Sequence, residues 1–144
     1  MITNGDEVTA RARLWKNGEK ETLTDESSNS CANSVFVSGK DVYVAGYSRY
    51  LIGNSDVPVA KLWKNGKAQK LTNGTKNAEA FSVCVSGNDV YVAGYVKVIE
   101  ELEPGSGGLP YSIGYFKATL WKNGKKLDLK VGKADSQAIS VFVK

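Results

Sequence analysis

The chain repeats two short words in step with each other. Trp-Lys-Asn-Gly occurs at 15–18, 63–66 and 121–124, and Ser-Val-(Phe/Cys)-Val occurs at 34–37, 82–85 and 140–143. For both words, 48 residues separate the first copy from the second and 58 separate the second from the third. Two words that keep one register indicate an internal repeat, and a period of this length is typical of structural units that stack on one another.

Each repeat predicts four short antiparallel strands. Over 34–72 these are Ser34–Ser38, Asp41–Tyr47, Val59–Lys64 and Lys67–Thr72, since apolar residues alternate along each run. Asn65-Gly66 predicts a type I′ turn, because both central residues of that turn need a positive φ. We therefore expect one complete unit at 34–72 and another at 82–130. The second unit carries an insertion within 96–117, where Glu-Pro-Gly-Ser-Gly-Gly-Leu-Pro predicts a loop.

Tandem four-stranded units of roughly 40–50 residues are typical of β-propeller blades. One such unit cannot bury both of its faces, so neighbouring units cover each other. We expect Trp15, Trp63 and Trp121 to fill the spaces between units. The predicted fold class is all-β, built from propeller blades that are four-stranded antiparallel meanders, with three blade equivalents in the chain.

The repeats are out of phase with the ends of the chain. Ser140–Lys144 matches a first strand, whereas residues 4–10 match a degenerate second strand that leads into third and fourth strands within 12–24. Residues 1–24 and 140–144 would thus form one split blade. Propellers have about four to eight blades, and six is the multiple of three in that range. We therefore expect a six-bladed homodimer with strand exchange.

The exchanged strand predicts the oligomer interface. Val141, Phe142 and Val143 of one copy are expected to pair with a segment of the other copy that contains Val8 and ends at Ala10. A fragment of a longer propeller is an open alternative, and we expect such a piece to associate as well.

The words Leu-Trp-Lys-Asn-Gly, Ser-Val-Phe-Val-Ser-Gly and Asp-Val-Tyr-Val-Ala-Gly-Tyr resemble the tandem blades of uncharacterised bacterial propeller proteins. The resemblance covers nearly all of the chain except 96–117. It implies a propeller fold and an extracellular or cell-surface location, and it transfers no catalytic residue. The first residues carry no basic region followed by an apolar one, so no signal peptide is predicted in this chain.

Composition argues against several classes of function. The chain has no histidine, and its two cysteines, Cys31 and Cys84, form no CxxC pair, so Cys/His metal sites are not expected. Whether the two cysteines form a disulfide stays open. The net charge of +4 is spread over all repeats, which does not predict a nucleic-acid surface, and no apolar run is long enough for a membrane span. We expect no enzymatic activity and no cofactor.

The stretches expected to be long loops, Ser48–Pro58 and Val96–Lys117, are the candidate binding regions. They contain Asp56 and the tyrosines Tyr50, Tyr111 and Tyr115, whose rings could stack on a sugar ring or a peptide. The segment Asp25-Glu26-Ser27-Ser28-Asn29 is too short for a calcium loop and lacks the spacing of its ligands. A lectin with one site per blade should repeat its ligand residues, and these loops do not repeat. A non-enzymatic interaction or structural module is thus preferred, with a glycan-binding propeller as the alternative.

Overall fold

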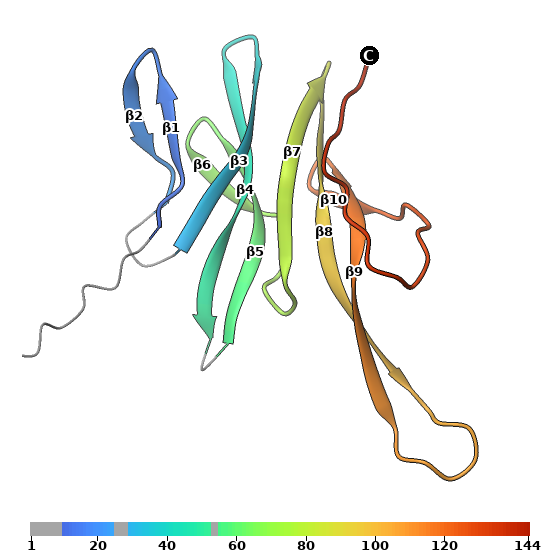
Figure 1. The fold of residues 1–144 in the computed structure, drawn as a ribbon. Coiled ribbons are helices and arrows are strands. Elements are labelled where there is room, and N and C mark those ends of the chain that lie inside the picture. Colours follow the sequence, from blue (N-terminus) through green and yellow to red (C-terminus); the bar gives the residue numbers. More distant parts are fainter. Residues whose placement is uncertain (1–9, 25–28, 53–54) are drawn as a thin grey trace, which may run out of the picture.

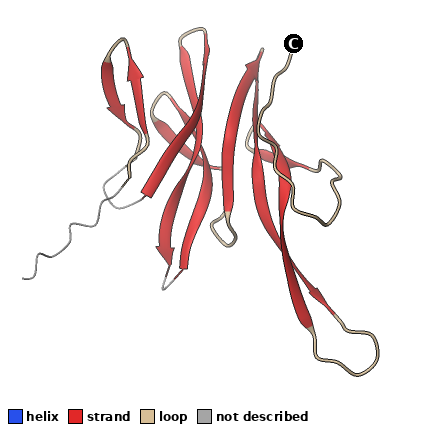
Figure 2. Cartoon of the chain, in the orientation of Figure 1, coloured by secondary structure: helices blue, strands red, loops and turns tan. Residues whose placement is uncertain are grey.

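The computed structural model describes residues 10–24, 29–52 and 55–144. Within those residues the chain is all-β, without a helix (Figure 2). Ten strands are described: β1 (Arg13–Lys16), β2 (Glu19–Thr22), β3 (Asn29–Ser38), β4 (Asp41–Ile52), β5 (Ser55–Lys64), β6 (Lys67–Lys70), β7 (Ala78–Ser86), β8 (Asp89–Leu102), β9 (Tyr111–Lys122) and β10 (Lys125–Leu127).

The strands form three antiparallel sheets that follow one another along the chain (Figure 1). The first is the hairpin β1–β2, the second is the meander β3-β4-β5-β6, and the third is the meander β7-β8-β9-β10. In both meanders every strand pairs with its neighbour in sequence. The sequence prediction of four-stranded antiparallel units is therefore confirmed for these two sheets.

An Asn-Gly turn closes the last hairpin of each of the three sheets. Asn17, Asn65 and Asn123 have φ values of 51°, 50° and 51°, and the glycines that follow have φ values of 81°, 81° and 80°. Two positive φ values in succession define the type I′ turn expected from the sequence. The asparagine also anchors the turn: Asn65 Oδ1 accepts the Val42 N–H at 2.9 Å, and Asn123 Oδ1 accepts the Val90 N–H at 2.8 Å.

Two apolar cores join the three sheets. One face of the β3–β6 sheet, with Val44 and Trp63, packs on Ala12 and Leu23 of the first hairpin. Its other face packs on the third sheet, in a core of ten buried residues: Tyr43, Ala45, Ala60, Leu62, Leu71, Ala78, Ala80, Val83, Val92 and Trp121. Because strand side chains alternate between faces, Leu62 and Trp63 lie in different cores.

Strands β3 and β7 each contain a break in register at the same repeat position. The shifts fall between Ala32 and Ser34 and between Ala80 and Ser82. At the break the backbones of paired strands come so close that a Cβ added to Gly94 would lie 2.0 Å from the Glu79 carbonyl oxygen. Gly46 stands in the same relation to Cys31. Only glycine fits such an approach.

The candidate loops expected from the sequence are mostly strand, so that expectation is wrong. β4 continues to Ile52 and β5 already begins at Ser55. The ladder between β8 and β9 likewise reaches the pair Leu102 and Tyr111. The insertion therefore lengthens a hairpin, and only 103–110 connects its two strands. Alternating residues such as Val96 and Val98 extend the ladder beyond the repeated words.

The expected first strand at Ser140–Lys144 is not a strand in this single chain. Residues 128–144 instead form an extended arm without a ladder partner in the described structure. The expected second strand near the N-terminus falls largely on residues outside the described part, Val8 among them. Ala10 is described, and its carbonyl oxygen accepts the Ser30 N–H at 2.8 Å. Phe116 of β9 makes the equivalent bond with Ser136 at 2.7 Å, so Ala10 holds a third-strand position rather than a second-strand one.

Hydrogen bonds from backbone N–H groups of the third strands to side-chain oxygens also recur at the repeat intervals. The residue that provides the oxygen differs between copies. Asn29 Oδ1 accepts the Ala10 N–H and Asp135 Oδ1 accepts the Phe116 N–H, whereas Pro58 at the intermediate position has no N–H. In a second series the Thr24 and Thr72 hydroxyls accept the N–H groups of Ala12 and Ala60. In the third copy Lys130 replaces the threonine, and Ser136 Oγ accepts the Ala118 N–H instead.

Candidate functional site

The tip of the β4–β5 hairpin carries two of the sequence-predicted binding residues, and both are engaged within the chain. The Tyr50 hydroxyl accepts a hydrogen bond from the ammonium group of Lys61, which is buried. The ammonium of Lys70 also lies 5.3 Å from the centre of the Tyr50 ring. Asp56 forms an ion pair with Arg49 at 3.3 Å. The two described side chains at this end of the hairpin, Tyr50 and Asp56, are therefore engaged in polar contacts within the chain.

The β8–β9 hairpin carries the other two predicted residues. The Tyr115 side chain is 9% exposed, and its hydroxyl donates to Glu100 at 3.0 Å. Lys133 of the arm pairs with the same carboxylate at 2.9 Å. The hydrogen bond from Lys133, followed by that from Tyr115, lowers the pKa of Glu100. Tyr111 is 53% exposed near the end of the hairpin.

These four residues do not form one site. Tyr50 and Asp56 belong to the second sheet, whereas Tyr111 and Tyr115 belong to the third. Figure 1 shows the β8–β9 hairpin extending away from the body well beyond the β4–β5 tip. A shared sugar or peptide site built from all four residues is not what the fold presents.

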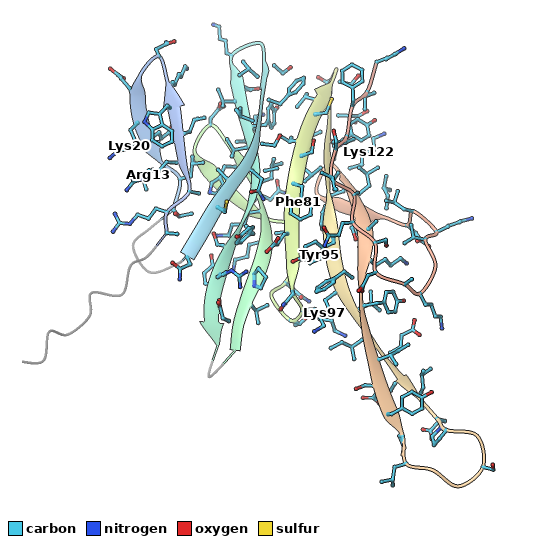
Figure 3. The ribbon with its side chains drawn as sticks, in the orientation of Figure 1. Arg13, Lys20, Phe81, Tyr95, Lys97 and Lys122 are labelled. Carbon is cyan, nitrogen blue, oxygen red and sulfur yellow. The ribbon has the colours of Figure 1, made fainter. Side chains whose placement is uncertain are left out.

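A polar cluster links the second and third sheets. Arg49 of β4 lies 3.7 Å from the carboxylate of Glu79 on β7. Burial raises the pKa of Glu79, and Arg49 opposes that effect. The ring of Tyr95 on β8 contacts the rings of Phe81 and Phe116, whose centres lie 5.7 and 4.9 Å away. Figure 3 labels Tyr95 and Phe81. Burial, followed by the negative charge of Glu79, raises the pKa of Tyr95 to about 12.

A cavity of about 420 Å³ opens between the second and third sheets, beside Leu71, Val96 and Trp121. Three lysines also line it, Lys76, Lys97 and Lys126, and no carboxylate does. Figure 3 labels Lys97 at the root of the β8–β9 hairpin. The cavity lining therefore carries positive charge, whereas the charged side chains at the two hairpins form ion pairs.

Repeated apolar residues are exposed on the first hairpin and on the face of the second sheet that carries Val44 and Trp63. Trp15 is 62% exposed, whereas its equivalents Trp63 and Trp121 are 0% and 1% exposed. Val35 is 53% exposed, and its equivalent Val83 is 4% exposed. A groove of about 330 Å³ lies between Trp15 and Val35 and is also lined by Ala32, Asn33 and Val44. We call this surface the open end.

The arm lies on the opposite end of the molecule, against the third sheet (Figure 1). The Val141 N–H donates to Ser82 Oγ at 3.2 Å, and the Ala138 N–H donates to the Gly94 carbonyl at 3.1 Å. The Val83 N–H makes the equivalent bond to Ser34 Oγ at 3.3 Å. The arm therefore sits on the third sheet in the way that β7 sits on the second. Phe142 is 76% exposed, and Val141 and Val143 are partly buried.

The described residues include two cysteines, which the sequence left open as a disulfide pair. Cys31 and Cys84 are free thiols, so the disulfide left open by the sequence does not form. In the described ranges no three His, Cys, Asp or Glu side chains converge to hold a metal ion. The same part of the chain has no helix that is long and apolar enough to cross a membrane.

Comparison with known proteins returned no match: no family model, no curated protein and no solved structure resembles the chain closely enough to be matched. The surfaces described above are therefore the basis for a functional proposal. Sequence reasoning did not single out Arg49 or Lys133, which tie sheets and arm together. Neither residue belongs to a repeated word, so the repeat gave no signal for them.

Proposed function

We propose that the chain is a non-enzymatic interaction or structural module that closes into a six-bladed β-propeller when two copies associate. The unequal burial of equivalent residues carries this proposal. Trp63 and Trp121 are covered by the sheet that precedes each of them, whereas Trp15 is 62% exposed. A stack of sheets that exposes an apolar face at one end can bury that face against a further sheet.

The energetic incentive for closure is large. Fully burying one large apolar side chain contributes about 1.5–3 kcal/mol. Trp15, Val35 and Val37 are all more than half exposed at the open end, and Ile139 and Phe142 are more than two thirds exposed on the arm. Contiguous exposed apolar residues of this kind mark an association surface.

A second copy supplies what the open end lacks. The first hairpin has only β1 and β2 in the described structure, while the other two sheets have four strands each. The arm of a partner would take the first-strand position of the unit whose third and fourth strands are β1 and β2. Two such junctions would join two chains around one two-fold axis and give six blade equivalents.

Mass in solution tests this proposal. Light scattering coupled to gel filtration should give twice the mass of one chain at micromolar concentration, and dilution should shift the distribution towards single chains. A single-chain mass that persists at high micromolar concentration would contradict it.

The glycan-binding alternative gains no specific support from the geometry. Tyr50 is held by lysines, Tyr115 is buried, and Tyr111 stands alone on the third sheet. Binding to a panel of immobilised glycans, weakened by Tyr111→Ala, would be needed to favour a lectin over an assembly module.

A further inference from the structure

We infer that two atoms of a partner subunit complete the open end: the Ser140 hydroxyl accepts the Val35 N–H, and the Leu129 carbonyl accepts the Trp15 indole N–H. This inference rests on the proposed self-association and names the contacts that make it specific. The first contact is the missing member of a series whose two other members form inside one chain, and the second is the counterpart of the bond between Trp63 and Leu23.

The first series joins the first strands of consecutive units. The Val83 N–H donates to Ser34 Oγ at 3.3 Å, and the Val141 N–H donates to Ser82 Oγ at 3.2 Å. Ser34, Ser82 and Ser140 are equivalent in the repeat, and so are Val35, Val83 and Val141. The remaining pair is therefore Val35 with Ser140.

The backbone of Val35 is in the right register for this bond. Val83 pairs with Val92 across β7 and β8, and its N–H points away from β8 towards Ser34. Val35 pairs with Val44 in the same register across β3 and β4. Its N–H therefore points out of the sheet edge, since donors alternate in direction along an antiparallel strand.

The second contact joins a tryptophan to the unit before it and is formed once inside the chain. Trp63 Nε1 donates to the Leu23 carbonyl at 3.0 Å. Both residues of this contact are buried, with Leu23 8% exposed and Trp63 0% exposed. The repeat makes Trp15 and Leu129 the corresponding pair, and they are 62% and 40% exposed. Both halves of one contact are thus uncovered in the single chain.

One chain cannot make these contacts with itself. The first hairpin and the segment after β10 stand at opposite ends of the row of sheets (Figure 1). The arm is already fixed to its own third sheet through Ser82 and Gly94. It therefore presents Ser140 outward in a preformed position, so a second copy that meets it orders few new residues and loses little entropy on binding.

Disulfide trapping tests the first contact. In a background of Cys31→Ser and Cys84→Ala, a Val35→Cys chain is mixed with a Ser140→Cys chain of different mass and oxidised mildly. A cross-linked heterodimer is expected. The intrachain pair Ser82→Cys with Val141→Cys is the matched control, because its hydrogen bond is the equivalent one within a chain.

Amide hydrogen exchange and fluorescence measure the same contacts without cross-linking. In the dimer, Ser140→Ala should speed exchange at Val35 about five-fold, the effect of losing one neutral hydrogen bond, and leave Val83 unchanged. The matched variant Ser34→Ala should speed exchange at Val83 instead. Trp15 should be quenched by acrylamide in dilute single chains and become protected on association, a change that Trp15→Phe abolishes.

The outcomes separate this inference from the proposed function. A dimer in which Val35 exchange ignores Ser140→Ala and Trp15 stays accessible to quencher would overturn these contacts and leave self-association standing. A chain that stays single at every concentration would overturn both.

Discussion

Tyr95 illustrates how the fold perturbs one side chain. Its ring packs against Phe81 and Phe116, and its hydroxyl faces Glu79, whose own charge is partly compensated by Arg49. The repeat predicts Tyr95 as a strand residue equivalent to Tyr47, but Arg49 and Glu79 have no counterpart in the repeated words. The polar environment of Tyr95 was thus not predictable, because it depends on contacts between two sheets.

Titration of Tyr95 should be displaced to high pH. Its pKa is about 12 in the folded chain and about 10 when unfolded. The folded chain therefore holds this proton more tightly, so the stabilisation is complete below about pH 10 and is lost as the pH rises towards 12. Near-ultraviolet absorbance should show a late tyrosine titration that is missing in Tyr95→Phe. Simultaneous titration of every tyrosine near pH 10 would disagree.

The three repeated tryptophans should differ in their contribution to stability. Trp63→Ala should lower the free energy of unfolding by about 3–5 kcal/mol, because it empties a fully buried site. Trp15→Ala in the dilute single chain should change it by less than about 0.5 kcal/mol, since the side chain is largely exposed. Urea unfolding measures both variants. Equal losses would mean that Trp15 is already packed in the single chain.

At the scale of strands, the sequence predicts positions better than lengths. Alternation and Asn-Gly locate the strand centres and the type I′ turns, because these signals are local. The sequence predicts loops where β4, β5, β8 and β9 extend, since these extensions lie outside the repeated words. Of the predicted site residues, Tyr115 is buried by Glu100 and the arm, a long-range arrangement that no local pattern encodes.

The register shifts in β3 and β7 depend on the glycine that faces each of them. Gly94→Ala should lower the free energy of unfolding by about 1–3 kcal/mol, as overpacking does, because the new Cβ would overlap the Glu79 carbonyl. Gly105→Ala is the control, since it meets nothing within 4 Å. Thermal unfolding compares the two. An unchanged melting temperature for Gly94→Ala would show that the strands separate at little cost.

At the scale of the whole molecule, both ends of the row of sheets differ from its interior. The interior faces are buried in two apolar cores, whereas the open end and the arm keep apolar residues exposed. The repeat phase predicts that the ends are incomplete. The spacing of the repeat also makes Ala10 equivalent to Pro58 and Phe116, both third-strand residues, and the degenerate match of residues 4–10 to a second strand hides this signal.

Removing residues 139–144 should keep the chain folded and abolish its association. The deletion spares Ser136 and Ala138, which bond to β9 and to Gly94. Circular dichroism should therefore show an unchanged β spectrum while light scattering reports single chains. Association that survives the deletion would place the interface elsewhere.

The edge bonds around Ala118 show how the copies have drifted apart while keeping one fold. The hydroxyl that Thr24 and Thr72 provide is absent at Lys130, and Ser136 replaces it from a different place in the chain. In the third unit the acceptor for this N–H therefore lies at Ser136, whereas the first two units provide it from the position of Lys130. An engineer who splices these units into longer arrays must keep Lys130 with Ser136, since a junction that brings in Ala78, the equivalent of Ser136, would leave the Ala118 N–H without this acceptor.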